Sequence, residues 1–173
     1  MQGDVFGLST VYERQVENLT NNNFASWPES ATTGYYGGGF TTISVCTIDR
    51  LDFSTETVSV PTPKLSQARD NLAATSSSSY GYFGGGGIPG VVCTIDRLDF
   101  STETVSVPTP KLSQARSQLA ATSSSSYGYF GGGFVPSVVS TIDRLDFSTE
   151  TVSVPTPKLS QARRSLAAVS NSN

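Results

Sequence analysis

Carboxylates recur at one spacing along the chain, and paired carboxylates are groups with which many enzymes perform acid–base catalysis. The recurring residues are Asp52, Asp99 and Asp146 with Glu56, Glu103 and Glu150. A catalytic pair needs two carboxylates in different environments, so that their pKa values separate. These six residues lie in three identical segments, which give identical local environments, and no segment has the Asp and Gly spacing of a calcium loop. We therefore expect these carboxylates to bond the backbone of turns, and we expect neither a catalytic pair nor a metal site.

Two sets of arginines recur with the same spacing. Arg50, Arg97 and Arg144 each follow an aspartate, Asp49, Asp96 and Asp143. An arginine cluster of the sialidase kind would be accompanied by an Asp box of the form SxDxGxTW, which the chain lacks, so we expect salt bridges or solvated strand edges here. Arg69, Arg116 and Arg163 lie between a proline-containing loop and a short apolar stretch. The five-donor fork of arginine favours a structural role for this second set, bonding backbone carbonyls or a carboxylate.

Several classes of function are excluded or disfavoured by composition. The 173 residues include no histidine, which removes histidine base catalysis, most zinc sites and most copper sites. The net charge is only −3 and no basic run is present, so nucleic acid is not an expected partner. No Lys-Ser or Lys-Thr follows the glycine clusters, so they are not phosphate loops. We expect no cofactor and no enzymatic activity.

The two cysteines, Cys46 and Cys93, occupy equivalent positions 47 residues apart, and Ser140 takes that position in the next repeat. Equivalent positions on neighbouring repeats are in general too far apart for a disulfide. We expect two free, buried thiols and folding in a reducing cytoplasm. No stretch has the pattern of a signal peptide or the length of a membrane span, so we expect no membrane insertion.

Tyrosines and glycines mark the start of each repeat. Tyr80 and Tyr82, like Tyr127 and Tyr129, alternate along a predicted strand and so share one face of it. The favoured interpretation is a layer of rings packed between repeats. The alternative is a row of aromatic platforms that contact sugars or another surface. The glycines that follow permit positive φ and close backbone approach, and their expected role is structural; they are Gly37, Gly38, Gly84, Gly85, Gly131 and Gly132.

These residues are positioned by an internal repeat of 47 residues. The 23-residue segment TIDRLDFSTETVSVPTPKLSQAR occurs without change at 47–69, 94–116 and 141–163. A fixed period of this length indicates a repeat architecture, in which each unit buries its apolar face against its neighbours. The predicted units are 33–79, 80–126 and 127–173.

Each unit predicts four short antiparallel strands. In the second unit these are 80–83, 91–100, a strand around 104–107 that the two prolines after Val107 end, and 119–122. Leu112, Ala115 and Leu119 also fit one face of a helix over 112–122; the serine run that follows favours loop and then strand. We expect an all-β protein in which each unit folds as one four-stranded sheet.

Residues 1–32 lie outside the repeat. Apolar residues at three- and four-residue steps between Val5 and Leu19 predict a short N-terminal helix, whose firm part begins near Val11. This segment is expected either to cap the first repeat or to anchor the chain to another subunit.

The order of features resembles the kelch motif of β-propellers. Leu119-Ala120-Ala121 is similar to its first strand, the run Tyr127 to Gly132 to its second, Leu145-Asp146 to its Tyr-Asp corner, and Arg163 to the arginine that precedes the apolar strand. Leu and Val replace the two marker aromatics, so the repeat is divergent. The resemblance implies four-stranded blades of a propeller or partial propeller over 33–173.

The phrases YGYFGGG and STIDRLDFSTETVSVP also resemble repeat proteins of tailed bacteriophages, particularly those that infect cyanobacteria. This resemblance implies a structural or adhesive virion component, such as a tail fibre, tail appendage or capsid-attached protein. It further implies host-surface glycan or protein contact and a location in the virion after synthesis in the host cytoplasm. The alternative is a bacterial carbohydrate-binding propeller module.

Three units are too few to close a propeller, which typically has 4 to 8 blades. Open sheet edges are templates for pairing with another chain. We therefore expect other virion proteins or further copies of the chain to bind through the N-terminal helix and the open blade edges.

Overall fold

The computed structural model describes residues 31–171, and the expectation of an all-β fold is confirmed for that part of the chain. Every strand pairing there is antiparallel, and no helix occurs among the described residues. Residues 33–171 belong to one compact unit. The predicted N-terminal helix lies outside the described residues.

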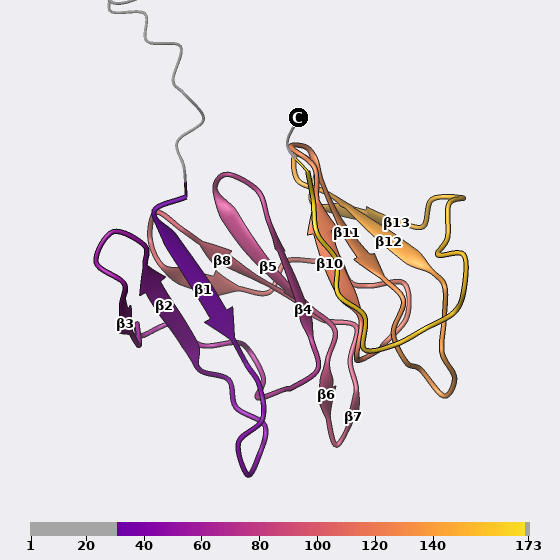
Figure 1. Ribbon diagram of the computed structural model, residues 1–173, viewed down its shortest axis with the longest axis horizontal. Helices are drawn as coiled ribbons and strands as arrows, with labels where there is room; N and C mark the ends of the chain where they lie inside the picture. Colours follow the sequence, from indigo (N-terminus) through magenta and orange to yellow (C-terminus); the bar gives the residue numbers. More distant parts are fainter. Residues whose placement is uncertain (1–30, 172–173) are drawn as a thin grey trace, which may run out of the picture. The chain divides into compact units, whose positions relative to one another are not determined.

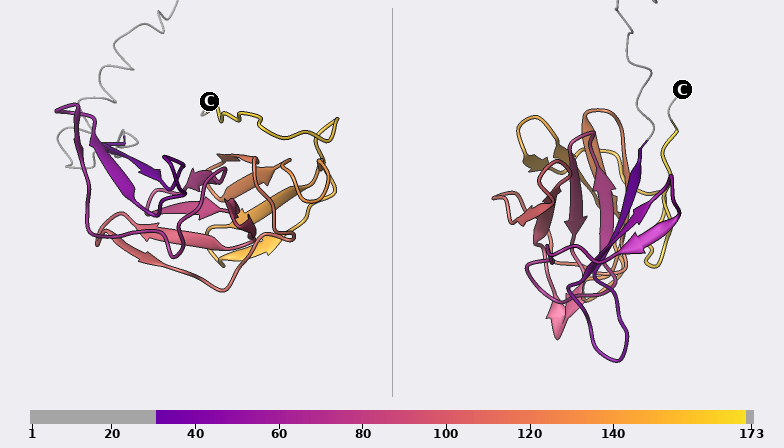
Figure 2. Two further views of the ribbon diagram at one scale, coloured as in Figure 1. Left: turned by 90° about the horizontal axis from the view of Figure 1, so that it is seen from below. Right: turned by 90° about the vertical axis from the view of Figure 1, so that its left-hand side faces the viewer.

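Three main sheets follow one another in chain order (Figures 1 and 2). The first contains β1 (Thr33–Gly37), β2 (Ile48–Asp52) and β3 (Thr57–Ser59). The second contains β4 (Ala73–Ser76), β5 (Tyr80–Gly84), β8 (Ile95–Asp99) and β9 (Thr104–Ser106). The third contains β10 (Ala120–Ser123), β11 (Tyr127–Gly131), β12 (Ile142–Asp146) and β13 (Thr151–Ser153). A small hairpin of β6 (Gly87–Ile88) and β7 (Gly90–Val91) projects from the second repeat.

The division of sheets among repeats differs from the prediction of one sheet per unit. Strand β4 belongs to the first unit by sequence but pairs with β5 of the second, Ala73 opposite Gly84. Strand β10 pairs with β11 of the third unit in the same way, Ala120 opposite Gly131. Each four-stranded sheet thus takes its outer strand from the preceding repeat. The chain therefore enters the next sheet at β4 or β10, before the serine turn, and not at the strand that follows the turn.

The predicted strand over 91–100 is wrong as a single element, because residues near its start bond outside the sheet. Val92 donates its N–H to the carbonyl of Gly86 and accepts at its own carbonyl from the N–H of Arg116, and the carbonyl of Cys93 accepts from Leu112. Within the predicted range, β8 is the part that pairs with other strands of the second sheet. The same bonds hold the 111–116 loop against the sheet, so the alternative of a helix over 112–122 is wrong and the predicted apolar strand is present as β10.

The core lies between successive sheets. One cluster of buried side chains joins the first two sheets: Ile48, Leu65, Phe83 and Leu98. A second joins the last two: Ala73, Tyr82, Ile95, Leu112, Leu119, Phe130 and Leu145. Equivalent backbone positions of consecutive repeats also bond directly, Gln118 N–H to the carbonyl of Asn71 at 2.7 Å and Ser165 N–H to the carbonyl of Gln118 at 2.8 Å. The described residues do not form a closed propeller; they form an open series of sheets.

Candidate functional site

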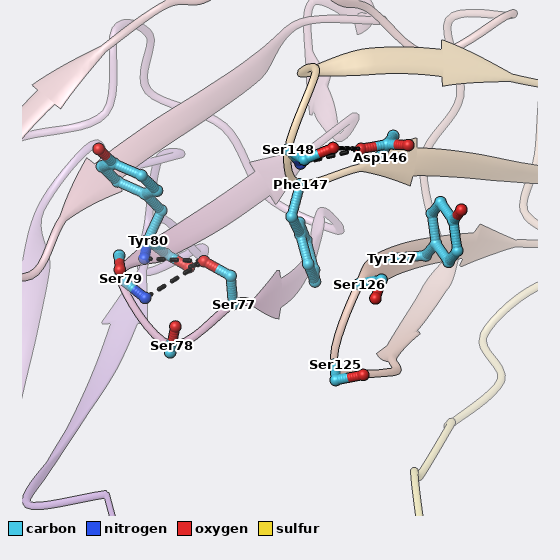
Figure 3. A pocket seen from close by; sticks show the side chains of 10 residues that line it. All are labelled: Ser77, Ser78, Ser79, Tyr80, Ser125, Ser126, Tyr127, Asp146, Phe147 and Ser148. Carbon is cyan, nitrogen blue, oxygen red and sulfur yellow. Dashed lines mark hydrogen bonds between the residues drawn. The ribbon is translucent and has the colours of Figure 1, made fainter.

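A serine- and tyrosine-lined groove lies between the serine turns that precede β5 and β11 and the turn that follows β12 (Figure 3). Its volume is about 410 Å³. The ring of Phe147 lies between the two serine turns, and tyrosine rings flank it on both sides. The lining residues are Ser77, Ser78, Ser79, Tyr80, Ser125, Ser126, Tyr127, Asp146, Phe147 and Ser148.

Each serine turn is held by its own first hydroxyl. Ser77 Oγ accepts the N–H of Tyr80 at 3.0 Å, and the Ser77 N–H donates to the Tyr80 carbonyl at 2.9 Å. Ser124 makes the same pair of bonds with Tyr127 at 3.1 and 2.8 Å. The next serines, such as Ser78 and Ser125, are exposed at the rim of the groove. Hydroxyls and aromatic rings arranged in this way are suited to neutral, hydroxyl-rich ligands.

The groove carboxylate is committed to its own turn. Asp146 Oδ1 accepts from Ser148 N–H at 2.9 Å, Ser148 Oγ at 2.7 Å and Thr149 N–H at 3.1 Å. The Ser148 hydroxyl bond is the main cause of the lowered pKa of Asp146. Asp52 and Asp99 make the equivalent bonds, and the serine hydroxyl lowers the pKa of Asp52 to about 2. The prediction that these aspartates bond turn backbones is confirmed.

The glutamates have a different role, which was not predicted. Glu103 accepts from Tyr35 Oη at 3.1 Å and pairs with Arg50 Nε at 3.2 Å. Glu150 accepts from Tyr82 Oη at 3.2 Å and from Arg97 Nη1 at 2.7 Å. In both cases a glutamate of one repeat bonds two residues of the repeat before it. The expectation of salt bridges at Arg50 and Arg97 is therefore confirmed, and the expectation that the glutamates bond turn backbones is wrong for Glu103 and Glu150.

The four tyrosines expected either between repeats or at the surface do not share one environment. Tyr82 is fully buried, because its ring stacks on Phe147 at 5.4 Å and an interplanar angle of 13°. Burial raises the pKa of Tyr82. Tyr80 and Tyr127 are half-buried, with the guanidinium groups of Arg97 and Arg144 over their rings at 4.7 and 4.8 Å. Tyr129 is half-buried, so the ring of Tyr82 is the one of the four that is not accessible at the surface.

The recurring arginines between loop and strand divide into two buried residues and one exposed residue. Arg69 Nη2 donates to the Phe83 carbonyl at 3.0 Å and to Asp96 Oδ2 at 3.1 Å. Arg116 Nη2 makes the same two bonds at 2.9 Å each, to the Phe130 carbonyl and to Asp143 Oδ2. Both pairs are fully buried, and burial lowers the pKa of both arginines. Arg163 ends the same 23-residue segment but is exposed.

The recurring glycines lie where two successive sheets pack together, a contact that we call the joint between repeats. A Cβ atom at Gly37 would lie 2.7 Å from Cε1 of Phe83, and one at Gly84 would lie 2.6 Å from Cε1 of Phe130. At Gly131 the nearest atom would be 3.7 Å away and in its own repeat. The second glycine of each cluster has positive φ; these are Gly38 at 72°, Gly85 at 69° and Gly132 at 67°. The first glycines of the first two clusters therefore admit an aromatic ring of the next sheet.

No group of histidine, cysteine, aspartate and glutamate within 31–171 is arranged to hold a metal ion. Cys46 and Cys93 are free and partly buried. Over the same part of the chain, no helix is long and apolar enough to cross a membrane.

In comparisons with known proteins, no protein-family model and no curated protein matches the chain. The class that the described residues define is an antiparallel β-repeat protein in which an arginine of one repeat bonds an aspartate of the next sheet at each joint.

Proposed function

We propose that this chain is a structural or adhesive component of a phage particle, belonging to a tail fibre, a tail appendage or the capsid surface. The observation that carries the proposal is the joint between repeats. Two consecutive joints use the same arginine–aspartate, arginine–glutamate and tyrosine–phenylalanine contacts. Construction from identical joined parts is typical of extended scaffolds. The virion assignment itself is supported by the resemblance of the repeated phrases to phage repeat proteins.

We also propose that the sheets are divergent kelch-like blades of a partial propeller. The outer strand supplied by the preceding repeat and the glycine cluster at the end of the next strand support this assignment. The buried arginines support it too, because they occupy the place of the arginine in the kelch-like pattern.

A carbohydrate-binding module is the second candidate function, and the groove of Figure 3 favours it. Exposed serines and half-buried tyrosines provide hydroxyl and aromatic groups for a sugar. The groove carboxylate, Asp146, already accepts three hydrogen bonds from its own turn, and neither candidate assigns it a catalytic role.

Mass spectrometry of purified phage particles and of the cell-free medium distinguishes the two candidates. Trypsin releases the same peptide, LDFSTETVSVPTPK, from 51–64, 98–111 and 145–158, so each chain contributes it three times. The peptide from 117–144 occurs once per chain and provides the internal control. A virion component should give both peptides from particles that remain intact through gradient purification. Their recovery from the medium alone would contradict the proposal and favour the secreted module.

A further inference from the structure

The two joints inside the chain define two complementary faces of a repeat. The trailing face carries a tyrosine and two arginines, which at the second joint are Tyr82, Arg97 and Arg116. The leading face carries their partners, Phe147, Glu150 and Asp143. At the first joint the trailing face is formed by Tyr35, Arg50 and Arg69, and the leading face by Phe100, Glu103 and Asp96. The same six residue types, at equivalent positions of the repeat, therefore join two different pairs of sheets.

The third repeat has a trailing face with no described partner. Tyr129, Arg144 and Arg163 follow the second joint's residues by 47 positions, so their types match those of the occupied faces. Arg69 and Arg116 are fully buried at their joints, whereas Arg163 is exposed. Leu159 and Leu166 are likewise partly exposed, while their equivalents Leu112 and Leu119 are buried.

The leading face of the first repeat likewise has no described partner. Phe83 and Phe130 are 3% and 0% exposed where they pack on a glycine of the preceding sheet, but their equivalent Tyr36 is 63% exposed. Phe53, the equivalent of the stacked Phe100 and Phe147, is 48% exposed. Asp49 is partly exposed and Glu56 is exposed.

The two faces are complementary in charge and in backbone. The trailing face presents the guanidinium groups of Arg144 and Arg163, and the leading face presents the carboxylates of Asp49 and Glu56. The segment 167–170 is equivalent to β4 and β10, yet it is in no strand, and Val169 is 90% exposed. Strand β1 ends the first sheet, and β2 is its one pairing partner among the described strands. An unpaired edge and a segment of strand-forming sequence can join by strand addition.

We propose that a second copy of this chain binds here head to tail, its leading face on the trailing face of the first. In this interface Arg163 of one copy pairs with Asp49 of its partner, Arg144 pairs with Glu56, and Tyr129 stacks on Phe53. The segment 167–170 adds to the outer edge of β1 in the register of the internal joints, with Ala167 opposite Gly37. Such a contact is heterologous, so copies form a ring if the rotation closes and a chain if it does not. Six sheets from two copies are enough for a closed ring.

The inference rests on the proposed function only in naming the partner of the structural component. It is tested on the purified chain, whereas the proposed function is tested on particles, so either can fail while the other stands. Residues 1–30 are kept in the protein used, because a segment of the same chain is the competing occupant of the β1 edge.

Sedimentation velocity over about 1 to 100 µM protein tests the inference with a charge exchange. The variants are Arg163→Asp, which makes the trailing face acidic there, and Asp49→Arg, which makes the leading face basic. Each variant alone should dissociate at least about tenfold more readily than the wild type, because like charges then meet. An equimolar mixture should recover association, because each altered face now meets either its normal or its exchanged partner.

Two controls separate loss of the interface from loss of the fold. Lys158→Asp makes the same charge change at an exposed residue whose equivalents, Lys64 and Lys111, remain exposed at both internal joints, and it should associate like the wild type. If Asp49→Arg unfolds, as judged by circular dichroism, the exchange is made at the other ion pair of the interface, with Arg144→Asp and Glu56→Lys. A wild-type chain that remains monomeric at 100 µM would overturn the inference. Association that both face variants retain, or that their mixture fails to restore, would overturn it as well.

Discussion

Replacing Arg116 by methionine should destabilise the protein by about 3 to 5 kcal/mol, the cost of removing one partner of a buried ion pair. Methionine retains most of the length and apolar volume of the side chain but donates no hydrogen bond. The change removes the bonds to the Phe130 carbonyl and to Asp143, both 2.9 Å long. Asp143 would remain fully buried, with the Ser113 N–H at 3.1 Å as its hydrogen-bond donor among the described residues.

The magnitude follows from burial rather than from the ion pair itself. A buried charge that has lost its partner is much more costly than a missing surface salt bridge, which contributes about 0 to 1 kcal/mol. Replacing both partners by apolar residues is often neutral or stabilising. The double variant Arg116→Met with Asp143→Leu should therefore recover much of the stability that the single variant loses.

The repeat provides a matched control within the same chain. Arg163→Met makes the same substitution within the same 23-residue segment, but at an exposed side chain. It should change the free energy of unfolding by no more than about 0.5 kcal/mol when the chain is monomeric.

Equilibrium urea unfolding, followed by circular dichroism at a concentration where the chain is monomeric, measures all three variants. The dependence on urea, m, should remain unchanged, so that a shift in midpoint reports stability. Equal losses for Arg116→Met and Arg163→Met would refute the reasoning, because they would show that the next repeat does not bury Arg116.

Two further predictions concern the glycine joint and the aspartate turns. Gly84→Ala should cost about 1 to 3 kcal/mol through overpacking, because the new Cβ would lie 2.6 Å from Phe130, whereas Gly131→Ala should cost much less in the monomer; thermal unfolding compares them, and equal melting temperatures would contradict the joint. The folded-state pKa of Asp52 is lowered from 3.8 to about 2, so its contribution to stability is present above about pH 4 and is lost as the pH falls toward 2. Replacing it and its two equivalents by asparagine should flatten the fall in melting temperature over this range, and an unchanged slope would show that these turns do not depend on the charge.

Most strands could be predicted from the sequence because their determinants are local. Alternation of valine with polar residues indicates β9, and the prolines that follow cannot continue a ladder. The extension of the predicted strand 91–100 across Val92 and Cys93 could not be excluded in this way. The carbonyls of both residues accept bonds from the 112–116 loop, and that contact depends on how the loop folds back.

The joints between sheets were less predictable, because their partners are far apart in sequence. Arg69 bonds Asp96, which is 27 residues away, and Tyr35 bonds Glu103, which is 68 residues away. The repeat shows that each contact should recur, but it does not show which tyrosine meets which glutamate. Recurrence also suggested identical environments for identical segments. Arg163 does not follow this expectation, because the next repeat, and not the neighbouring sequence, determines whether the arginine side chain is buried.

Each repeat buries the arginine of the repeat before it, and the exchange rates of arginine side-chain protons test this burial most directly. Nuclear magnetic resonance of the ¹⁵N-arginine-labelled monomer, assigned with Arg69→Lys, Arg116→Lys and Arg163→Lys variants, resolves these protons. Burial at the joints predicts slowly exchanging guanidinium protons for Arg69 and Arg116, and exposure predicts fast exchange for Arg163. Indistinguishable exchange at all three arginines, whether slow or fast, would contradict it.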